Sequence, residues 1–172
     1  MPELIPVLDK EKISSMITDV AKRISDDYQG KELILIGILK GSFIFMSDLV
    51  QKLSIPVKID FLGISSYGNG MNTSGTVQMT RPIGIDLQNK DVLIVEDIVD
   101  TGLSMTFIME HLQSYQPKSI KLCTMIDKKE RREADIAVDY SCHETDEGFL
   151  VGYGLDYAED YRYLPGIYHL KL

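Results

Sequence analysis

Cysteine and tryptophan are scarce in this sequence. Its 172 residues include no tryptophan and only two cysteines, Cys123 and Cys142. These two do not have the spacing of a metal site, and a pair of cysteines in a chain of this length does not build a disulfide framework. The scarcity is typical of proteins from a reducing compartment.

Long hydrophobic runs are missing as well. Apolar stretches such as residues 33–39 are far too short to span a bilayer. The N-terminal residues show no basic stretch followed by an apolar run. We therefore expect no signal peptide, no membrane partner and a cytoplasmic location.

Basic residues are fewer than acidic ones. The 18 Lys and Arg residues stand against 26 Asp and Glu, which gives a net charge of −8. Sequence-independent binding to nucleic acid needs a basic face, so this balance argues against a nucleic-acid partner. It does not exclude small phosphate ligands, which need only a few well-placed donors. Apolar residues make up 44% of the chain, enough for a core, so we predict a single domain over residues 1–172.

Apolar residues recur with two different periods along the chain. Steps of three and four mark one helix face over residues 9–28, with Asp9 as the N-cap and Gly30 as the stop. Further helices are expected over residues 43–53 and 101–112, and strands over 33–39, 57–64, 76–81, 92–95 and 120–126. This alternation predicts an α/β fold with a mostly parallel sheet flanked by helices.

Two segments depart from that alternation. Residues 65–75 hold three glycines and two asparagines without an apolar pattern, which predicts a mobile loop. After residue 135 the chain consists of short strand-like pieces rich in tyrosine and acidic residues, with a last strand near 167–170. We predict a core over about residues 9–134 and a small C-terminal hood over about 135–172, which the N-terminal residues join.

The strongest chemical signal lies in residues 92–104, where a buried strand runs directly into carboxylates. The polar part of this run is Glu96, Asp97, Asp100, Thr101, Gly102 and Ser104. Paired carboxylates at a strand end can accept hydrogen bonds from a vicinal diol such as that of ribose. Backbone N–H groups, two hydroxyls and a helix N-terminus suit a phosphate monoester. Ligands bind at the C-terminal ends of parallel strands, so the ends of strands 33–39, 92–95 and 120–126 should meet there.

Other interpretations of this run explain less of it. Asp100 alone would serve as an N-cap, but a cap does not explain two further acids past a buried strand. Residues 92–97 also resemble a Walker B strand, yet the sequence has no Gly-x-x-x-x-Gly-Lys-Ser/Thr loop. A phosphoacceptor receiver domain would place acids at strand ends without explaining residues 101–104 as a phosphate cradle.

Residues 92–104 resemble the phosphoribosyl-diphosphate-binding motif of the type I phosphoribosyltransferases, in the variant of the hypoxanthine-guanine branch. Further segments resemble that branch in the right order: a pyrophosphate loop at 39–42, the start of a lid at 65–68, a base-reading region at 127–132 and a C-terminal signature at 149–157 and 161–165. The resemblance implies an enzyme of purine salvage. It would transfer the phosphoribosyl group of 5-phosphoribosyl 1-diphosphate to N9 of a 6-oxopurine, hypoxanthine or guanine, giving IMP or GMP and diphosphate.

The resemblance also implies roles for matching residues. Asp100 would be the general base, and Glu96 and Asp97 would hold the ribose hydroxyls. The other implied assignments are phosphoribosyl diphosphate for Leu39, Lys40, Gly41, Asp100, Thr101, Gly102, Leu103, Ser104 and Arg162; the purine for Lys128, Phe149, Leu150 and Asp156; the lid for Ser66 and Tyr67; and magnesium for Glu96, Asp97 and Asp156. Mg²⁺ as cofactor, a homodimer or homotetramer, and a non-proline cis peptide between Leu39 and Lys40 are implied in the same way.

Each residue outside the main motif has a plainer interpretation when taken alone. Lys128 lies in a charged run, which is usually a solvated face, and Phe149 suits a core. Asp156 suits a turn and Arg162 a surface ion pair. A regulator on the same scaffold that binds RNA is the main functional alternative; the basic residues of 128–132 favour it, and the net charge of −8 argues against it.

Overall fold

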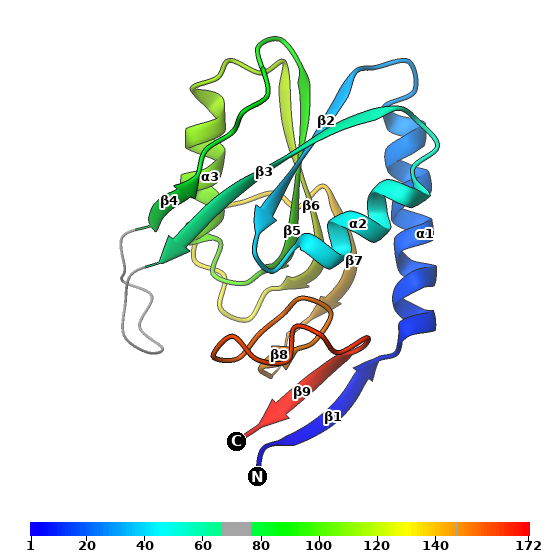
Figure 1. The fold of residues 1–172 in the computed structure, drawn as a ribbon, viewed down its shortest axis with the longest axis vertical. Helices are drawn as coiled ribbons and strands as arrows, with labels where there is room; N and C mark the ends of the chain where they lie inside the picture. The colour runs from blue at the N-terminus through cyan, green and yellow to red at the C-terminus, as the bar shows by residue number, and fades with distance from the viewer. Residues whose placement is uncertain (67–76, 147) are drawn as a thin grey trace.

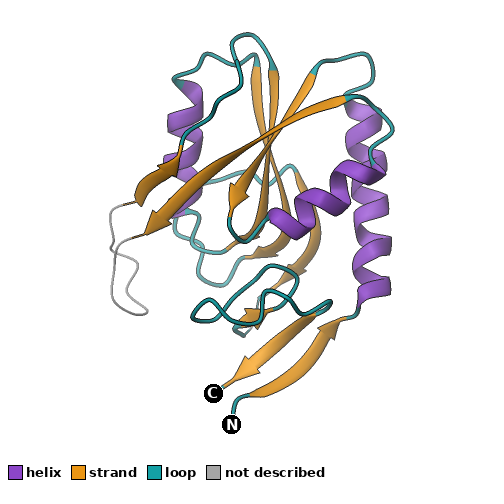
Figure 2. Ribbon diagram, in the orientation of Figure 1, coloured by secondary structure: helices purple, strands orange, loops and turns teal. Residues whose placement is uncertain are grey.

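The structure is a computed structural model, and it describes residues 1–66, 77–146 and 148–172 (Figure 1). Two β-sheets organise this part of the chain. A six-stranded sheet has the order β4-β3-β2-β5-β6-β7, and a three-stranded sheet has the order β1-β9-β8. Figure 2 shows the smaller sheet and its loops below the larger one, next to both chain termini.

The six-stranded sheet is mostly parallel, as the sequence predicts. Strands β2 (Leu33–Leu39), β3 (Val57–Ser66), β5 (Asp91–Val99), β6 (Ser119–Lys128) and β7 (Tyr140–Thr145) run in parallel, and β4 (Val77–Arg81) pairs antiparallel with β3 at the edge. All residues of β2 except the last are buried. A strand covered on both faces explains its uninterrupted apolar sequence.

Helices cover both faces of this sheet. Helices α1 (Lys10–Asp27) and α2 (Phe43–Lys52) lie on one face, and α3 (Leu103–Gln113) lies on the other (Figure 1). Alternate residues of β2 serve the two faces: Leu33 and Leu35 pack in the cluster of α1 and α2, whereas Ile34 and Ile36 pack in that of α3. Within the described ranges, no helix is long and apolar enough to cross a membrane.

The first helix begins where the sequence predicts. The carboxylate of Asp9 accepts a hydrogen bond from the backbone N–H of Lys12 at 2.8 Å, which is an N-cap contact. The helix ends at Asp27, with Tyr28 as its C-cap, and Gly30 takes a positive φ of 74° in the turn that follows.

The hood is the three-stranded sheet. Strand β1 (Glu3–Leu8) pairs antiparallel with β9 (Ile167–Lys171), which pairs with the short β8 (Leu150–Val151). The sequence places everything after residue 135 in the hood, and for β7 this is wrong, because β7 is the last strand of the main sheet. As an edge strand, β7 is mostly half-buried. It therefore lacks the apolar run that marks the central strands.

Two boundaries near the candidate motif also differ from expectation. Strand β5 continues through Glu96 and Asp97 to Val99, and α3 starts at Leu103. The two acids therefore belong to the strand itself, and the segment between strand and helix is only three residues long.

Candidate active site

A pocket of about 280 Å³ lies at the C-terminal ends of β2 and β5, under the hood. Its walls come from four parts of the chain: the end of β2 with the residues after it, Ile64 of β3, residues 96–105, and residues 152–166 between β8 and β9, which we call the hood loop. The lining residues are Ile38, Leu39, Gly41, Ile64, Glu96, Asp97, Ile98, Val99, Asp100, Thr101, Gly102, Ser104, Met105, Asp156 and Arg162. The pocket therefore gathers most of the residues that the sequence assigns to phosphoribosyl diphosphate.

Glu96 and Asp97 bring two carboxylates together at low exposure. Glu96 is 9% exposed and accepts the backbone N–H of Asp97 at 3.0 Å, while Asp97 accepts that of Ile98 at 2.8 Å. Burial raises the pKa of Glu96 well above its ordinary value, and the nearby charge of Asp97 raises it further. Burial also raises the pKa of Asp97, although the Arg162 guanidinium acts in the opposite direction. Because burial makes the ionised carboxylates unfavourable, a ligand that brings hydroxyl donors or positive charge would stabilise them.

Gly41 explains why the loop after β2 can lie directly against this pair. A Cβ atom built at Gly41 would stand 1.8 Å from a carboxylate oxygen of Asp97. Any side chain at this position would displace that carboxylate. The close approach of loop and acid therefore depends on glycine.

The segment from Asp100 to Ser104 forms the opposite wall. Gly102 is the N-cap of α3, with a φ of 83°, and as glycine it has no side chain that could cap the helix. The hydroxyl of Thr101 accepts the N–H of Leu103 at a long 3.4 Å. The first-turn amides and the two hydroxyls remain suited to an anion. Leu103 is 42% exposed and does not line the pocket, which leaves only its backbone for such a role.

The carboxylate of Asp100 is only partly engaged. Its Oδ1 is buried and has no hydrogen-bond partner in the described part of the chain, and its Oδ2 lies 3.5 Å from Nη1 of Arg131. Arg132 holds the backbone beneath it, since Nε donates to the carbonyl of Asp100 at 2.9 Å and Nη2 to that of Val99 at 3.2 Å. Arg132 also pairs with the buried Asp127 at 2.5 Å.

These contacts of Arg131 and Arg132 are absent from the expectations based on sequence. Both residues belong to a charged run, and no local spacing distinguishes a solvated arginine from one that supports a strand end 33 residues earlier.

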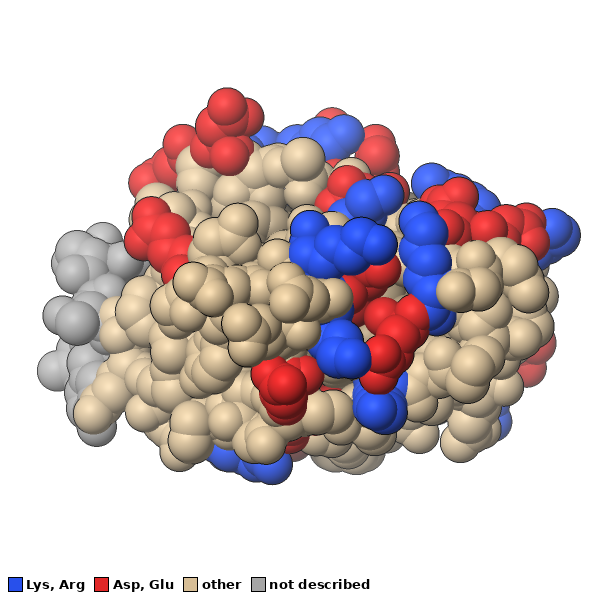
Figure 3. Space-filling view, turned by 90° about the horizontal axis from the view of Figure 1, so that it is seen from above, with Lys and Arg blue, Asp and Glu red and all other residues tan. Residues whose placement is uncertain are grey.

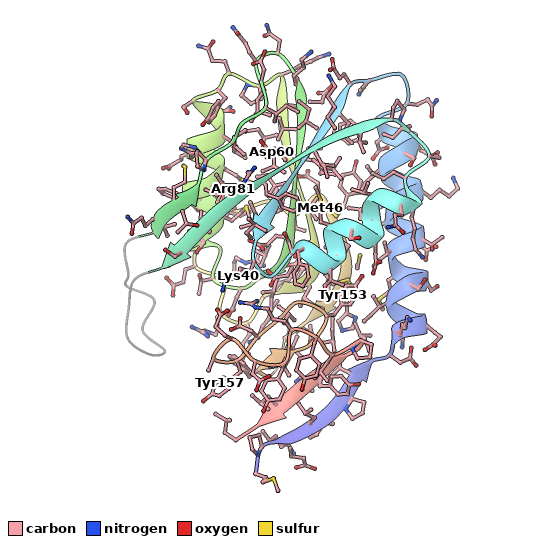
Figure 4. All side chains as sticks on the ribbon, viewed as in Figure 1. Lys40, Met46, Asp60, Arg81, Tyr153 and Tyr157 are labelled. Atoms are coloured by element: carbon pink, nitrogen blue, oxygen red, sulfur yellow. The ribbon has the colours of Figure 1, made fainter. Side chains whose placement is uncertain are left out.

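The hood loop forms the side of the pocket that faces away from the sheet. Asp156 and Arg162 line the pocket, and their side chains pair with each other at 3.2 Å. Lys40 lies beside the hood loop, as Figure 4 shows, and pairs with Glu159 at 2.6 Å. The peptide bond between Leu39 and Lys40 is cis, which confirms the prediction for this junction.

Of the residues assigned to the purine, Asp156 lines this pocket, whereas Lys128, Phe149 and Leu150 lie outside its lining. Lys128 ends β6 and is 8% exposed, and Leu150 starts β8 and is also buried. Phe149 is half-exposed and meets Tyr157 edge to face, with 5.6 Å between ring centroids. Of the predicted lid, Ser66 is the last residue of β3, and Tyr67 with the rest of the loop falls outside the described residues.

Magnesium has suitable donors here, although the protein does not assemble a complete cage. No group of three His, Cys, Asp or Glu side chains within the described ranges is arranged to hold a metal ion alone. Mg²⁺ keeps several waters and commonly binds through one or two carboxylates plus substrate phosphates. Glu96, Asp97 and Asp156 line the same pocket, and among the described residues the buried oxygen of Asp100 has no partner. These donors fit such a shared site.

The end of the molecule away from the hood carries a mixture of basic and acidic side chains. Figure 3 views the molecule from that end and shows Lys and Arg side chains interleaved with Asp and Glu. Glu32, for example, pairs with both Lys58 and Lys90, at 3.0 Å and 2.7 Å. This face is therefore not uniformly basic.

Comparison with known proteins gives consistent matches. The family model of the phosphoribosyl transferase domain matches residues 7–158. The hypoxanthine-guanine phosphoribosyltransferase of Staphylococcus aureus is 44% identical over 165 residues, covering 96% of this chain and 92% of that protein. The enzyme of the same name from Aquifex aeolicus is 42% identical over 166 residues, covering 96% of this chain and 93% of that protein.

Solved structures agree with these relatives. A crystal structure of a hypoxanthine phosphoribosyltransferase from Staphylococcus aureus superposes with a TM-score of 0.92 at 44% identity, covering 96% of this chain and 90% of that one. A Trypanosoma cruzi hypoxanthine phosphoribosyl transferase, studied for the role of its C-terminal region in oligomeric state and activity, superposes with a TM-score of 0.90 at 38% identity, covering 96% of this chain and 90% of that one. The domain match, the identity of 42–44% along nearly the whole chain and the pocket together show that this chain belongs to the type I phosphoribosyltransferase family, in its hypoxanthine-guanine branch.

Proposed function

We propose that this protein transfers the phosphoribosyl group of 5-phosphoribosyl 1-diphosphate to N9 of hypoxanthine or guanine, releasing diphosphate and forming IMP or GMP. The observation that carries the proposal is one pocket in which a buried carboxylate pair faces a phosphate cradle, with basic groups of the hood beside them. A ribose phosphate with a diphosphate leaving group needs these three kinds of partner in one place.

Glu96 and Asp97 bind the ribose hydroxyls in this proposal. Hydroxyl donors stabilise the ionised carboxylates, whose burial otherwise favours the protonated form. The 5′-phosphate lies against the hydroxyls of Thr101 and Ser104 and the first-turn amides of α3, where the partial positive charge of the helix N-terminus stabilises it.

The departing diphosphate is held on the other side of the pocket. Lys40, with the adjoining Gly41 backbone, and Arg162 supply positive charge and donors where negative charge develops. Glu96, Asp97 and Asp156 would hold magnesium, which would supply further neutralisation of the diphosphate. The hood excludes water, which would otherwise capture the cationic sugar.

Asp100 accepts the proton in this proposal. As N9 of the purine bonds to the ribose carbon, N7 loses its proton, and a nearby carboxylate is a suitable acceptor. The carboxylate of Asp100 lines the pocket and is 30% exposed, and its Oδ2 makes only a long 3.5 Å contact with Arg131 in the described part of the chain, so it can turn to the purine. Arg132 keeps the Asp100 backbone in place.

Recognition of the base falls to three residues near the end of β6 and the hood. An ammonium group only donates hydrogen bonds, so Lys128 favours an oxo group at C6 over an amino group. Phe149 is half-exposed and has an aromatic face on which a purine can stack. The backbone of Leu150 meets the edge of the base.

The assembly and location remain predictions of the family resemblance. We propose a homodimer or homotetramer, and a cytoplasmic protein.

A panel of bases tests the proposed function directly. Purified protein should convert hypoxanthine and guanine, but not adenine, to nucleotides when phosphoribosyl diphosphate and Mg²⁺ are present. Chromatographic detection of IMP and GMP, with release of diphosphate measured in parallel, gives the readout. A protein that cleaves phosphoribosyl diphosphate without forming nucleotide with any base would contradict the proposal.

A further inference from the structure

The carboxylate of Glu159 pairs with Lys40 and Arg162, the two cationic side chains that the proposed function assigns to diphosphate. One carboxylate oxygen lies 2.6 Å from Nζ of Lys40, and the other lies 3.3 Å from Nη2 of Arg162. Lys40 follows β2, whereas Glu159 and Arg162 belong to the hood loop, 119 or more residues further along the chain. A single carboxylate therefore bridges cations from both sides of the pocket.

The backbone around Glu159 holds this side chain in place. Its own N–H donates to Oδ2 of Asp156 at 2.9 Å, and backbone hydrogen bonds join Tyr157 and Asp160 in both directions. Glu159 and its neighbour Ala158 both have positive φ angles, 68° and 52°. Such angles are uncommon for residues other than glycine and persist where the surroundings fix them.

The hood loop also lies directly against the loop that carries Lys40. A Cβ atom at Gly154 would stand 2.1 Å from the carbonyl oxygen of Gly41. The backbone N–H of Gly154 donates to the carbonyl of Arg162 at 3.0 Å, and the guanidinium of Arg162 donates back to the carbonyl of Gly154 at 2.7 Å. This contact keeps Glu159 within reach of Lys40.

The ion pair itself is well placed to exchange partners. The side chains of Lys40 and Glu159 are 66% and 64% exposed, so water remains available to both when they separate. Exposed pairs of this kind contribute little net stability. Arg162 keeps a second contact with Asp156, and its Nε is buried with no hydrogen-bond partner in the described part of the chain. A diphosphate could replace the Glu159 carboxylate on both cations at little cost.

We propose that Glu159 is a positioning residue that acts as a built-in counter-anion of the diphosphate subsite. It holds Lys40 and Arg162 together while the subsite is empty and competes with diphosphate for them. This inference rests on the proposed function, because it takes Lys40 and Arg162 as the diphosphate-binding cations. It predicts that the negative charge of Glu159 weakens diphosphate binding and speeds release of that product.

Direct binding measurements test this role. Titration of inorganic diphosphate with Mg²⁺ into the full chain should show about two- to tenfold tighter binding for Glu159→Gln, the range expected from losing one or two exposed charge pairs. Glu159→Ala should shift the affinity in the same direction. The gain should shrink at about 1 M salt, where charge competition is screened.

A matched control comes from the next residue. The carboxylate of Asp160 accepts the N–H of Tyr161 at 2.8 Å within the same loop. Asp160→Asn should bind diphosphate as the unaltered protein does. The affinity for IMP should stay the same in all variants, since IMP carries no diphosphate.

Failure of this inference can be distinguished from failure of the proposed function. If the unaltered protein forms nucleotide but Glu159→Gln binds diphosphate equally or more weakly, Glu159 merely supports the loop and the inference is wrong. If the unaltered protein neither binds diphosphate nor forms nucleotide, the proposed function fails, and the inference fails with it. Melting temperatures of the variants show whether each one is folded.

Discussion

Two groups of buried carboxylates on the main sheet differ in how their charge is satisfied. Asp60, inside β3, is 9% exposed and accepts four hydrogen bonds. Its donors are the N–H groups of Phe61 at 2.8 Å, Gly84 at 2.7 Å and Ile85 at 3.1 Å, and the Arg81 guanidinium at 2.9 Å. Figure 4 shows Asp60 and Arg81 on neighbouring strands.

Glu96 and Asp97, near the end of β5, have fewer partners within the described ranges. Each accepts a single backbone hydrogen bond, from the residue that follows it. The two carboxylates lie next to each other at the pocket wall, and the charge of Asp97 raises the pKa of Glu96.

The pKa shifts reflect this difference. Burial alone would raise the pKa of Asp60, but the hydrogen bonds from Gly84, Phe61 and Arg81 outweigh it and lower the pKa below its ordinary value. At Glu96 burial prevails and the pKa rises. A buried charge that the protein satisfies contributes to stability, whereas one left for a ligand contributes to binding and catalysis.

The largest expected effect concerns a third acid of the pocket, Asp100. Asp100→Asn keeps the shape and removes the proton acceptor, so kcat should fall by roughly 10²–10⁴-fold, the usual size of a general-base contribution. The melting temperature should change little, because Oδ1 has no partner in the described part of the chain. Single-turnover rates and the affinity for phosphoribosyl diphosphate should be measured on the same variant. A collapse of affinity with an intact single-turnover rate would make Asp100 a binding residue.

The next largest effect is expected at Lys128, a buried cationic side chain at the end of β6. Lys128→Ala should raise KM for hypoxanthine by about 10- to 100-fold, since hydrogen bonds to charged groups contribute about 1.5–3 kcal/mol. It should also relax the preference for 6-oxopurines over adenine. Lys129→Ala is the matched control, because that side chain is exposed and pairs with Glu144 at 3.2 Å. Unchanged base selectivity in Lys128→Ala would remove Lys128 from the base site.

Asp60 should behave in the opposite way, with an effect on stability and little on chemistry. Asp60→Asn should lower the free energy of unfolding by about 1–3 kcal/mol at pH 7, because buried donors then face a weaker acceptor. The folded-state pKa of Asp60 is lowered, so its contribution is present above the unfolded pKa of about 3.9 and is lost as pH falls through the folded value.

Urea unfolding at pH 7, 5 and 3 measures this contribution. The gap between Asp60→Asn and the unaltered protein should narrow at pH 3. Asp86→Asn serves as a control, because Asp86 is exposed and accepts only the N–H of Gln88, at 3.0 Å. A gap that is equally wide at pH 3 and pH 7 would show that the charge of Asp60 is not its cause.

The parts of the fold that follow from local chemistry could be predicted from the sequence. Strand β2 spans the predicted residues, since a strand buried on both faces must be apolar throughout. The cap at Asp9 is local in the same sense. The motif of residues 92–104 contains the acids, the hydroxyls and the helix start that line the pocket, so this part of the candidate site could be predicted from the sequence.

Features that depend on distant partners could not be predicted in this way. Strand β7 is half-buried at a sheet edge, and its polar sequence carries no strand-like run. The contact between Lys40 and Glu159 joins residues 119 positions apart. Arg132 lies in a charged run whose sequence does not show that it supports Asp100. Each of these depends on a partner elsewhere in the fold: β6 for β7, the hood for Lys40, and the end of β5 for Arg132.

The smallest expected effect is a gain in stability, from Glu96→Gln. An unfolded Glu ionises near pH 4.3, whereas burial raises the folded-state pKa of Glu96 well above that. Between these two values the folded state holds a proton that the unfolded state has lost, so stability falls as pH rises. Above the folded pKa the full penalty for the buried charge remains. Glutamine carries no charge, so the variant should be the more stable protein at pH 7, and the difference should vanish toward pH 4.

Melting curves of the apo protein, recorded with a chelator so that no cation compensates the pair, measure this difference. A gain of a few degrees is expected, since about 1 kcal/mol shifts the melting temperature by roughly 2–4 °C in a domain of this size. Glu32→Gln provides the contrast: Lys90 and Lys58 lower the pKa of Glu32, so its removal should bring no gain at pH 7. If Glu96→Gln melts below the unaltered protein at pH 7, the protein itself compensates the buried charge, and the contrast between Asp60 and the pocket pair does not hold.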